Sequence, residues 1–397
     1  MNKKRYLFIS PYFYPEILPI NNFFRELSKT KDVIVLTSLP SYRKNSFYDG
    51  YNYLGPYKER YGNIQIIRVP VIPRLGNTKF LILLFYFSFF LMSFFVGVII
   101  AIKNRGKIID IMSFGGSPVF TGYIGILMSF IAKCSSSIWI QDIWPEAIIS
   151  TVGLKNRFFL KMIDNLQEIM WSKSDKIYCQ SEVLFNFIKK KFPSKKSYLL
   201  HNTSGIKDKP VKNIKKKIEF SKLNLVYAGQ IGFGQNLENI LYSLTFNQNQ
   251  NIILYLCGEG AAKENLVAKY RSKNIIFLNW LEEDEMFKLF EKCHMALVSL
   301  NAVGRQSLIL PGKVQAYVEM NLPILSINSG ATNEFVEKNQ IGYSIRANED
   351  CLKDEIYKIK KIITNKLYDN WLKNLNKINK SVFNKKLIVD KYLISHN

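Results

Sequence analysis

The stretch RQSLILPGKVQAYVEMNLPILSINSG, residues 305–330, guides the interpretation of the rest of this chain. The pair Pro311-Gly312 interrupts the chain, VQAYVEM then follows helical spacing, and residues 321–323 end the predicted helix before the apolar strand ILSI. Lys313 therefore stands in the first turn of a helix, where backbone N–H groups lack partners within the helix. Such a lysine suits an anion such as phosphate, although a basic residue near an ordinary helix start is the plain alternative.

Short, continuous apolar runs recur along the chain, with longer helical stretches between them. Continuous runs are typical of strands buried on both faces, and strands that alternate with helices predict parallel, doubly wound sheets. Thirteen such strands exceed one sheet of this type, so we predict an α/β fold with two Rossmann-like domains. The runs are residues 6–10, 33–38, 64–69, 108–114, 137–144, 176–181, 197–202, 223–229, 251–258, 274–280, 295–300, 323–327 and 342–345.

A polar, strongly basic segment, SGIKDKPVKNIKKKIEFSK at 204–222, is typical of a linker. We therefore predict an N-terminal domain over residues 1–204, a linker over 205–222 and a C-terminal domain over 223–370. Residues 371–397 indicate a helical tail, which could pack back on the N-terminal domain.

The bulk composition agrees with two folded domains. The chain has 397 residues, of which 48% are hydrophobic, and its formal net charge is +24. That charge favours an anionic partner, and we favour a nucleotide or a membrane over nucleic acid because the aromatic residues follow apolar runs rather than basic ones. The five cysteines form no C-x-x-C pair, which argues against a structural zinc site and fits a reducing cytoplasm.

The segment FLILLFYFSFFLMSFFVGVIIAI at 80–102 carries no charge and lies between Lys79 and Lys103. Its length and hydropathy are those of a transmembrane helix. A single span would separate strands that the pattern places in one sheet, so we expect a helix or bent hairpin that dips into one leaflet. The alternative is an unusually apolar helix buried within the domain.

In the second half, glycines follow two predicted strands. Gly229, Gly232 and Gly234 lie after the first strand, and Gly258 ends the next one. Glycines at these strand ends would let backbone N–H groups approach a phosphate, although an ordinary glycine-rich turn would look similar.

Charged and polar side chains accompany these loops. Arg305 and Lys313 are the candidates for a diphosphate, with the Ser307 hydroxyl between them, and the alternative is solvated surface charge. Glu334 follows the strand at 323–327. It could accept hydrogen bonds from a ribose or a sugar, or simply stabilise a helix start through the helix dipole.

In the first half, QDIWPE at 141–146 places two carboxylates, Asp142 and Glu146, at the end of an apolar strand. Asp142 could equally cap the following helix. Ser117 lies in a second strand-end loop, GGSP. The only histidines are His201, His294 and His396, so none within residues 1–200 can act as a base there. A carboxylate would have to do that work, or the mechanism needs no enzymic base.

Several of these segments resemble one family. LPGKVQAYVEMNLPILSI (310–327), QDIWPE (141–146), YAGQIGFGQNLENIL (227–241) and PYFYPEILPINNFFREL (11–27) are similar to segments of bacterial family 4 glycosyltransferases. The similarity is to the branch that builds O-antigen and capsule repeat units with amino sugars. The family fold is GT-B, in which two Rossmann-like domains face a cleft.

The resemblance implies a retaining transferase that moves a sugar from a nucleotide-diphosphate sugar, UDP-linked, to a polyprenyl-diphosphate-linked acceptor. Lys313 would contact the diphosphate, while the 229–234 loop and Glu334 would help to hold the donor. The first half would bind the acceptor, with Glu16 and Ser117 on the acceptor side and Asp142 and Glu146 as catalytic candidates. The enzyme would work at the cytoplasmic face of the membrane, as a peripheral or monotopic protein, with no metal and no cofactor.

The sequence departs from the family at defined positions. A Glu-x7-Glu pair is common in the family, and its two positions here are Leu308 and Ala316, while Glu319 is displaced by three residues. The usual Arg before Asp142 is Gln141. Two other functions therefore stay open: a nucleotide-sugar epimerase of the same architecture, and a non-catalytic nucleotide-sugar-binding membrane protein.

Overall fold

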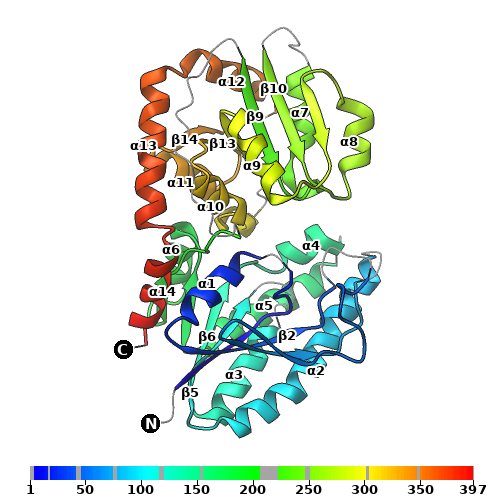
Figure 1. Cartoon of the computed structure of the whole chain (residues 1–397), viewed down its shortest axis with the longest axis vertical. Helices are drawn as coiled ribbons and strands as arrows, with labels where there is room; N and C mark the ends of the chain where they lie inside the picture. Colours follow the sequence, from blue (N-terminus) through cyan, green and yellow to red (C-terminus); the bar gives the residue numbers. More distant parts are fainter. Residues whose placement is uncertain are drawn as a thin grey trace. The chain divides into compact units, whose positions relative to one another are not determined.

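The structure is a computed structural model, and the chain divides into two compact units. Unit 1 comprises Met1–Gly205 with Lys385–Asn397, and unit 2 comprises Ile206–Asn384; Figure 1 colours them along the sequence. The predicted linker contains the boundary, but its residues 206–221 lie outside the described residues. The structure describes residues 4–16, 18–41, 46–74, 78–115, 120–152, 154, 156–205, 222–245, 251–300, 304–346 and 349–396.

Unit 1 contains an 8-stranded sheet in the order β3-β4-β2-β1-β5-β6-β7-β8. Every neighbouring pair is parallel except β3 with β4. Between the edge strands β3 and β8, the chain winds outward in both directions from the β1–β5 pair, which is the doubly wound order. The strands are β1 Arg5–Ile9, β2 Asp32–Ser38, β3 Lys58–Tyr61, β4 Ile64–Val69, β5 Ile108–Gly115, β6 Ser135–Ile140, β7 Lys176–Cys179 and β8 Lys196–Leu199.

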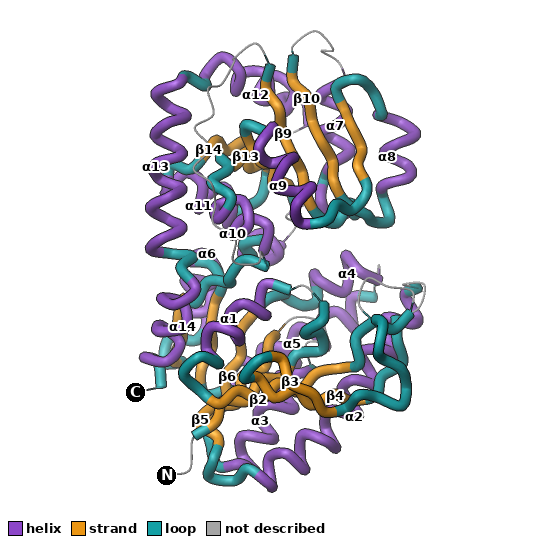
Figure 2. Tube along the Cα trace, viewed as in Figure 1, coloured by secondary structure: helices purple, strands orange, loops and turns teal. Residues whose placement is uncertain are grey.

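Unit 2 contains a 6-stranded, fully parallel sheet in the order β11-β10-β9-β12-β13-β14. This is again the doubly wound order, here starting from the β9–β12 pair. The predicted fold class, two Rossmann-like parallel-sheet domains, is confirmed, and Figure 2 shows the strands of each unit among their helices. The strands are β9 Leu223–Ala228, β10 Ile252–Cys257, β11 Ile275–Leu278, β12 Met295–Ser299, β13 Ile324–Ile327 and β14 Gly342–Ile345.

Helices connect the strands within both units. In unit 1 they are α1 Pro19–Leu27, α2 Lys79–Lys103, α3 Thr121–Ala132, α4 Glu146–Val152, α5 Arg157–Lys173, α6 Glu182–Lys191 and α14 Lys385–Ile394. In unit 2 they are α7 Leu237–Thr245, α8 Lys263–Tyr270, α9 Glu283–Lys292, α10 Gly312–Glu319, α11 Ala331–Asn339, α12 Glu349–Ile362 and α13 Asn365–Ser381.

One strand escaped the sequence analysis. β3 has the sequence KERY and alternates between exposed and partly exposed residues, so it lacks an apolar run. It pairs antiparallel with β4 through the two-residue turn Gly62-Asn63, where Gly62 has φ +58°. A Gly-Asn pair between two short strands favours such a hairpin, and this was the available signal.

The stretch at 305–330 folds as its sequence predicts. Pro311 is the N-cap residue of α10, with φ −60° and ψ 141°. Asn321 adopts the left-handed conformation at φ 52°, which ends the helix after Glu319 and turns the chain into β13. The turn is held by a hydrogen bond from Leu322 N to Tyr317 O at 2.9 Å.

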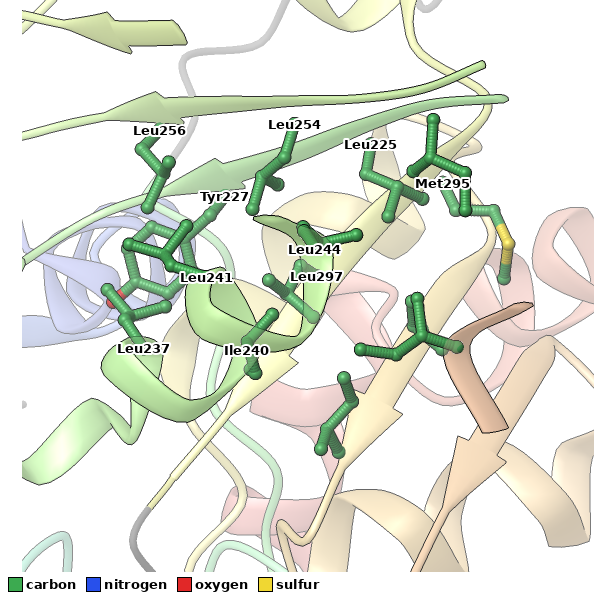
Figure 3. Close-up of a cluster of buried hydrophobic side chains, with 14 of the residues drawn as sticks. Leu225, Tyr227, Leu237, Ile240, Leu241, Leu244, Leu254, Leu256, Met295 and Leu297 are labelled. Carbon is green, nitrogen blue, oxygen red and sulfur yellow. The ribbon is translucent and has the colours of Figure 1, made fainter. Parts of the chain in front are cut away.

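Successive residues of β9 point into two separate cores, one on each face of the unit 2 sheet. Leu225 and Tyr227 belong to the same buried cluster as the side chains of α7, and Figure 3 shows Tyr227 beside Leu237 and Leu241. Val226, on the other face, packs with residues of α10 such as Val314. Because both faces are covered, β9 is continuously apolar from Leu225 to Ala228, and this part of its sequence shows no alternation.

Helix α2 packs on α3, β2 and β4 along one face only, and Figure 1 shows it running beside α3. It is one continuous helix and not a hairpin. Residues 80–103 are long and apolar enough to cross a membrane, with 28% of that apolar window buried, which by itself is weak support for a span. The alternative prediction, an apolar helix buried within the domain, is wrong. The side chains of Phe80, Phe87 and Ile102 are each more than 60% exposed.

The C-terminal residues divide between the units. α13 runs through the predicted boundary at residue 371, and Trp371 belongs to the core of unit 2. α14 instead packs against α1 in unit 1, with Ile388 and Tyr392 in that core. There the buried Asp110 accepts hydrogen bonds from Ser137 Oγ at 2.7 Å and from Tyr392 OH at 2.9 Å.

We expect Tyr392→Phe to lower the free energy of unfolding of unit 1 by about 1–3 kcal/mol, because a buried carboxylate loses a hydrogen-bond donor. Equilibrium urea unfolding of the full chain, fitted with one transition for each unit, measures this change. Tyr53→Phe is the control, because the Tyr53 side chain is 59% exposed. An equal effect of both substitutions would contradict a role for the Tyr392 hydroxyl in anchoring α14.

Candidate functional site

The C-terminal edge of the unit 2 sheet collects the loops that follow β9 and β10. β9 pairs with β10 on one side and with β12 on the other, so the chain leaves this point in opposite directions. Open α/β sheets bind ligands at such switch points. Gly229 follows β9 directly and Gly258 follows β10 directly, which places both predicted glycines at this edge.

Lys313 extends from the first turn of α10 to the same edge. Its stem is partly exposed, but its Nζ atom is buried and has no hydrogen-bond partner among the described residues. Nζ lies 3.8 Å from the centre of the Tyr227 ring and 3.5 Å from the place that a Cβ on Gly229 would occupy. The structure therefore brings Lys313 and Gly229 together.

Burial lowers the pKa of Lys313 to about 7. Burying an ammonium group is costly unless an anion neutralises it, and the face of the Tyr227 ring recovers only part of that cost. No carboxylate among the described residues pairs with this lysine. A buried cation that the protein itself leaves unneutralised, at a ligand-binding edge, is a candidate for contact with an anionic ligand.

Tyr317, one turn further along α10, fixes the position of Lys313. Its buried hydroxyl accepts a hydrogen bond from Ala228 N at 2.9 Å and donates one to Ala228 O at 3.3 Å. Ala228 is the last residue of β9, so these two bonds tie the helix to the strand end. The helix start is thereby held beside Gly229.

Two glycines allow the loops after β9 and β10 to approach each other. A Cβ on Gly258, at φ +148°, would lie 1.8 Å from Gly229 O, and a Cβ on Gly260, at φ +157°, would lie 2.2 Å from Ile231 O. Any side chain at either position would clash with backbone, so these glycines are structurally required.

Gly232 and Gly234 differ from those two. A Cβ on Gly234 would meet no atom within 4 Å, and one on Gly232 would come no closer than 3.9 Å to Gln230. The protein's own packing therefore does not require glycine at either place. The open space beside them is available to a ligand.

The remaining donor-side candidates lie near the start of α11. Ser307 and Arg305 belong to a 3-10 turn, Gly304–Leu308, and a Cβ on Gly330 would lie only 2.3 Å from Ser307 O. Gly330 directly precedes α11, and Glu334 is exposed in the first turn of that helix. Ser307 is thus packed against the start of α11.

Asn333 connects the start of α11 to the neighbouring strands, and the sequence analysis did not identify this residue. Its side chain is buried, and its Oδ1 accepts hydrogen bonds from Ser326 Oγ at 2.6 Å and Ser329 N at 3.0 Å. Its Nδ2 donates to Ile345 O at 2.9 Å. The Asn333 side-chain amide therefore joins the ends of β13 and β14 to α11. The periodicity of the sequence does not indicate such contacts between separate elements.

In unit 1, the QDIWPE loop follows β6. Asp142 and Glu146 are both partly exposed, and Glu146 is the first residue of α4. Gln167 of α5 fixes the loop, because its side chain accepts from Trp144 N at 2.8 Å and donates to Trp144 O at 2.8 Å. Gln141 and Asn202 exchange two side-chain hydrogen bonds at 2.9 and 2.7 Å.

Glu16, predicted on the acceptor side, has a structural task. It is 1% exposed, and its two carboxylate oxygens accept hydrogen bonds from Phe13 N at 3.2 Å and Ser41 N at 3.0 Å. It therefore joins the loops that follow β1 and β2. Ser117 lies outside the described residues.

One of the three histidines, His201, lies in unit 1 near the end of the predicted N-terminal domain of residues 1–204. His201 follows β8, is 5% exposed, and has its Nδ1 2.8 Å from Gln180 O. Because a carbonyl only accepts, Nδ1 carries a proton. His201 lies one residue beyond the range 1–200, which contains no histidine that could act as a base.

The sequence matches no protein-family model and no curated protein. Solved structures do match over the whole chain. WaaG, a glycosyltransferase involved in lipopolysaccharide biosynthesis, is 12% identical, with a TM-score of 0.63 and 98% of each chain covered.

Two further matches concern other sugars. Sucrose-phosphate synthase from Thermosynechococcus elongatus is 12% identical, with a TM-score of 0.67 over 99% of this chain and 98% of that one. An E. coli trehalose-6-phosphate protein bound with UDP-2-fluoro glucose is 10% identical, with a TM-score of 0.64 over 99% of each chain. These neighbours show that the chain has the GT-B fold.

We expect Lys313→Met, which keeps the stem and removes the ammonium group, to raise the free energy of unfolding of unit 2 at pH 7 by about 1–3 kcal/mol. The folded-state pKa of about 7 lies below the ordinary value of 10.5, so the unfolded chain binds more protons between these values. The cost of burying the charge is largest below pH 7 and disappears above the unfolded pKa.

The advantage of the Met variant should therefore shrink as the pH rises from 7 to 10, by at most about 1.4 kcal/mol per unit. Urea unfolding at several pH values measures it. A variant less stable than wild type would show that Lys313 has a stabilising partner.

Proposed function

We propose that this protein is a retaining glycosyltransferase. It transfers a sugar from a UDP-linked donor to a polyprenyl-diphosphate-linked acceptor, in the synthesis of a surface polysaccharide such as O-antigen or capsule. The observation that supports donor binding is the buried Lys313 ammonium group, which has no counter-ion among the residues that the structure describes and lies beside Gly229 at the switch point of a GT-B domain. The bound UDP-sugar analogue of the E. coli neighbour supports the choice of nucleotide.

Transfer breaks the bond between the sugar and the nucleotide diphosphate, and negative charge develops on the departing diphosphate. A preorganised ammonium group stabilises that charge without moving at the moment of reaction. Lys313 fills this role, and the open backbone at Gly232 and Gly234 gives the phosphates close access to N–H groups. Arg305, Ser307 and Glu334 hold the rest of the donor.

Unit 1 holds the acceptor in this proposal. Asp142 and Glu146, on the loop fixed by Gln167, orient the acceptor hydroxyl, and its proton passes to the departing phosphate oxygen. No metal or cofactor is required. The partly apolar exterior of α2 suits a lipid-linked substrate, and the protein acts at the cytoplasmic face of the membrane as a peripheral or monotopic protein.

The test is turnover by purified protein with membranes, a panel of nucleotide sugars and lipid-diphosphate acceptors. We expect release of UDP that requires an acceptor. If the protein neither releases nor binds a nucleotide, the proposal is wrong. Release of a converted donor sugar without any acceptor would instead identify an epimerase.

We expect Lys313→Ala to weaken UDP binding roughly 10- to 100-fold, the loss of one charge-assisted interaction, while the fold stays intact. Isothermal calorimetry measures the affinity, and Lys292→Ala is the control, because Lys292 is exposed on α9. Unchanged affinity in the Lys313 variant would exclude the assigned role.

The same lysine should make UDP binding depend on pH. A bound diphosphate raises the pKa of Lys313 from about 7, so binding takes up a proton above that pH. The affinity of wild type should fall as the pH rises from 7 to 9, by at most about tenfold per unit, whereas the Lys313→Ala variant should lack this dependence. Parallel pH profiles for the two proteins would argue against the coupling.

A second function, a non-catalytic nucleotide-sugar-binding membrane protein, is favoured by one observation. Leu308, in the 3-10 turn, and Ala316, in α10, occupy positions where carboxylates are common in the resembling family, and Glu319 lies at the last turn of α10. UDP binding without turnover for any acceptor, together with normal polysaccharide in a Lys313→Ala strain, would support this function.

A further inference from the structure

The C-terminal ends of α2 and α3 meet at an exposed part of unit 1. Gly106 N, just after α2, donates to Ala132 O, the last residue of α3, at 3.0 Å. Beside this junction is a depression of about 550 Å³, lined by Arg105, Ser129, Phe130, Ile131, Lys133 and Cys134. It lies at the N-terminal edge of the sheet, before β5 and β6, and therefore away from the QDIWPE loop.

An apolar ridge leads along α2 to this depression. Its eight members follow helical spacing on the face that is turned away from α3 and the sheet. They are Phe80, Leu83, Phe87, Leu91, Phe94, Phe95, Ile99 and Ile102, with exposed fractions between 37% and 68%. Phe130, in the wall of the depression, is 84% exposed. A continuous exposed apolar surface of this length marks an interaction site.

Basic side chains surround the end of the ridge. Lys103, Arg105, Lys107 and Lys133 are all exposed, and none forms an ion pair within the described part of the chain. The ends of two helices contribute partial negative charge here, which four cations exceed. Burial raises the pKa of the Cys134 thiol to about 12, so that group stays neutral.

The nearby carboxylates do not neutralise the depression. Asp175 accepts hydrogen bonds from Ser136 N at 2.8 Å and Ser136 Oγ at 2.9 Å. Asp110, a residue of β5, is fully buried and accepts a hydrogen bond from Tyr392 of α14. The accessible surface of the depression therefore combines cations with an exposed aromatic ring.

We propose that this surface docks on one leaflet of a bilayer that contains anionic phospholipid. The α2 ridge lies in the membrane plane with its side chains in the acyl region, and Arg105 and Lys133 hold a headgroup phosphate in the depression. The inference deepens the membrane association of the proposed function, because it names the lipid class and the residues that select it.

The packing of α2 favours a helix that lies in the membrane plane over one that spans the membrane. The opposite face of α2 contacts α3, β2 and β4, so a span would carry part of the sheet into the bilayer. A helix of 25 residues in the membrane plane covers about 37 Å, and its cations at one end lie at the headgroup level.

A second copy of the chain fits this surface less well than an anionic leaflet does. It would cover the ridge, but it would bring the same four cations against an identical surface. An anionic leaflet supplies both the apolar layer and the opposite charge.

Vesicle flotation tests the proposal with the full chain. The vesicles contain either phosphatidylcholine alone or phosphatidylcholine with a third phosphatidylglycerol. Wild type should bind the anionic vesicles roughly tenfold more tightly, and inorganic phosphate at matched ionic strength should not displace it. Equal binding to both vesicles, or displacement by phosphate, would overturn the headgroup assignment.

The variant Arg105→Gln/Lys133→Gln should lose most of the preference for anionic vesicles and keep its binding to neutral ones. The matched control is Lys189→Gln/Lys190→Gln, which removes the same charge from exposed positions on α6. Equal losses in both double variants would reduce the effect to overall charge and overturn the site.

The ridge has its own variant, Phe87→Gln/Phe95→Gln, which should weaken binding to both kinds of vesicle. If this variant instead converts a dimer into a monomer in the absence of vesicles, a second copy covers the ridge and the proposal fails. Circular dichroism confirms folding of each variant. UDP calorimetry on the same proteins separates the two proposals, because vesicle binding without UDP binding would refute only the proposed function.

Discussion

The parallel pairing of β9 with both β10 and β12 is the constraint on which the candidate site depends. The chain leaves this strand in two directions, and open α/β sheets bind ligands at such a switch point. Two donor-side candidates reach that end by different routes: Gly229 directly from the strand, and Lys313 from the start of α10. The two hydrogen bonds between Tyr317 and Ala228 then fix the helix against the strand.

The charge of Lys313 is what makes this arrangement informative. A fold selected for stability alone would neutralise the ammonium group or replace it with an apolar side chain. Here the lysine rests on the Tyr227 ring with its pKa lowered by burial, so the protein carries a cost that an anionic ligand would remove. Two other lysines of unit 2 offer a contrast: Lys263 is paired with Glu259 at 2.7 Å, and Lys269 with Glu238 at 2.9 Å.

Unit 1 has the same fold type, but its helix α2 is apolar on both faces. Its helix α2 must cover the sheet on one face and remain apolar on the other. An ordinary surface helix is amphipathic, and here both faces are apolar because both are to be removed from water, one by the protein and the other, in our proposal, by lipid. Hydrogen bonds and buried charge hold the rest of the unit, notably Asp110 beneath α14 and Glu16 between two loops.

The sequence by itself determined the order of strands and helices, the two-domain α/β class and the helix start that carries Lys313, because these follow from local apolar runs and from proline and glycine. It did not reveal β3, because three of the four residues in that edge strand are charged. Only the tertiary structure decided that Lys313 meets no counter-ion among the described residues and that Glu16 joins two loops. It also decided that α2 buries one face alone. These properties depend on contacts between residues that are distant in sequence. The spacing of residue types along the chain does not indicate such contacts.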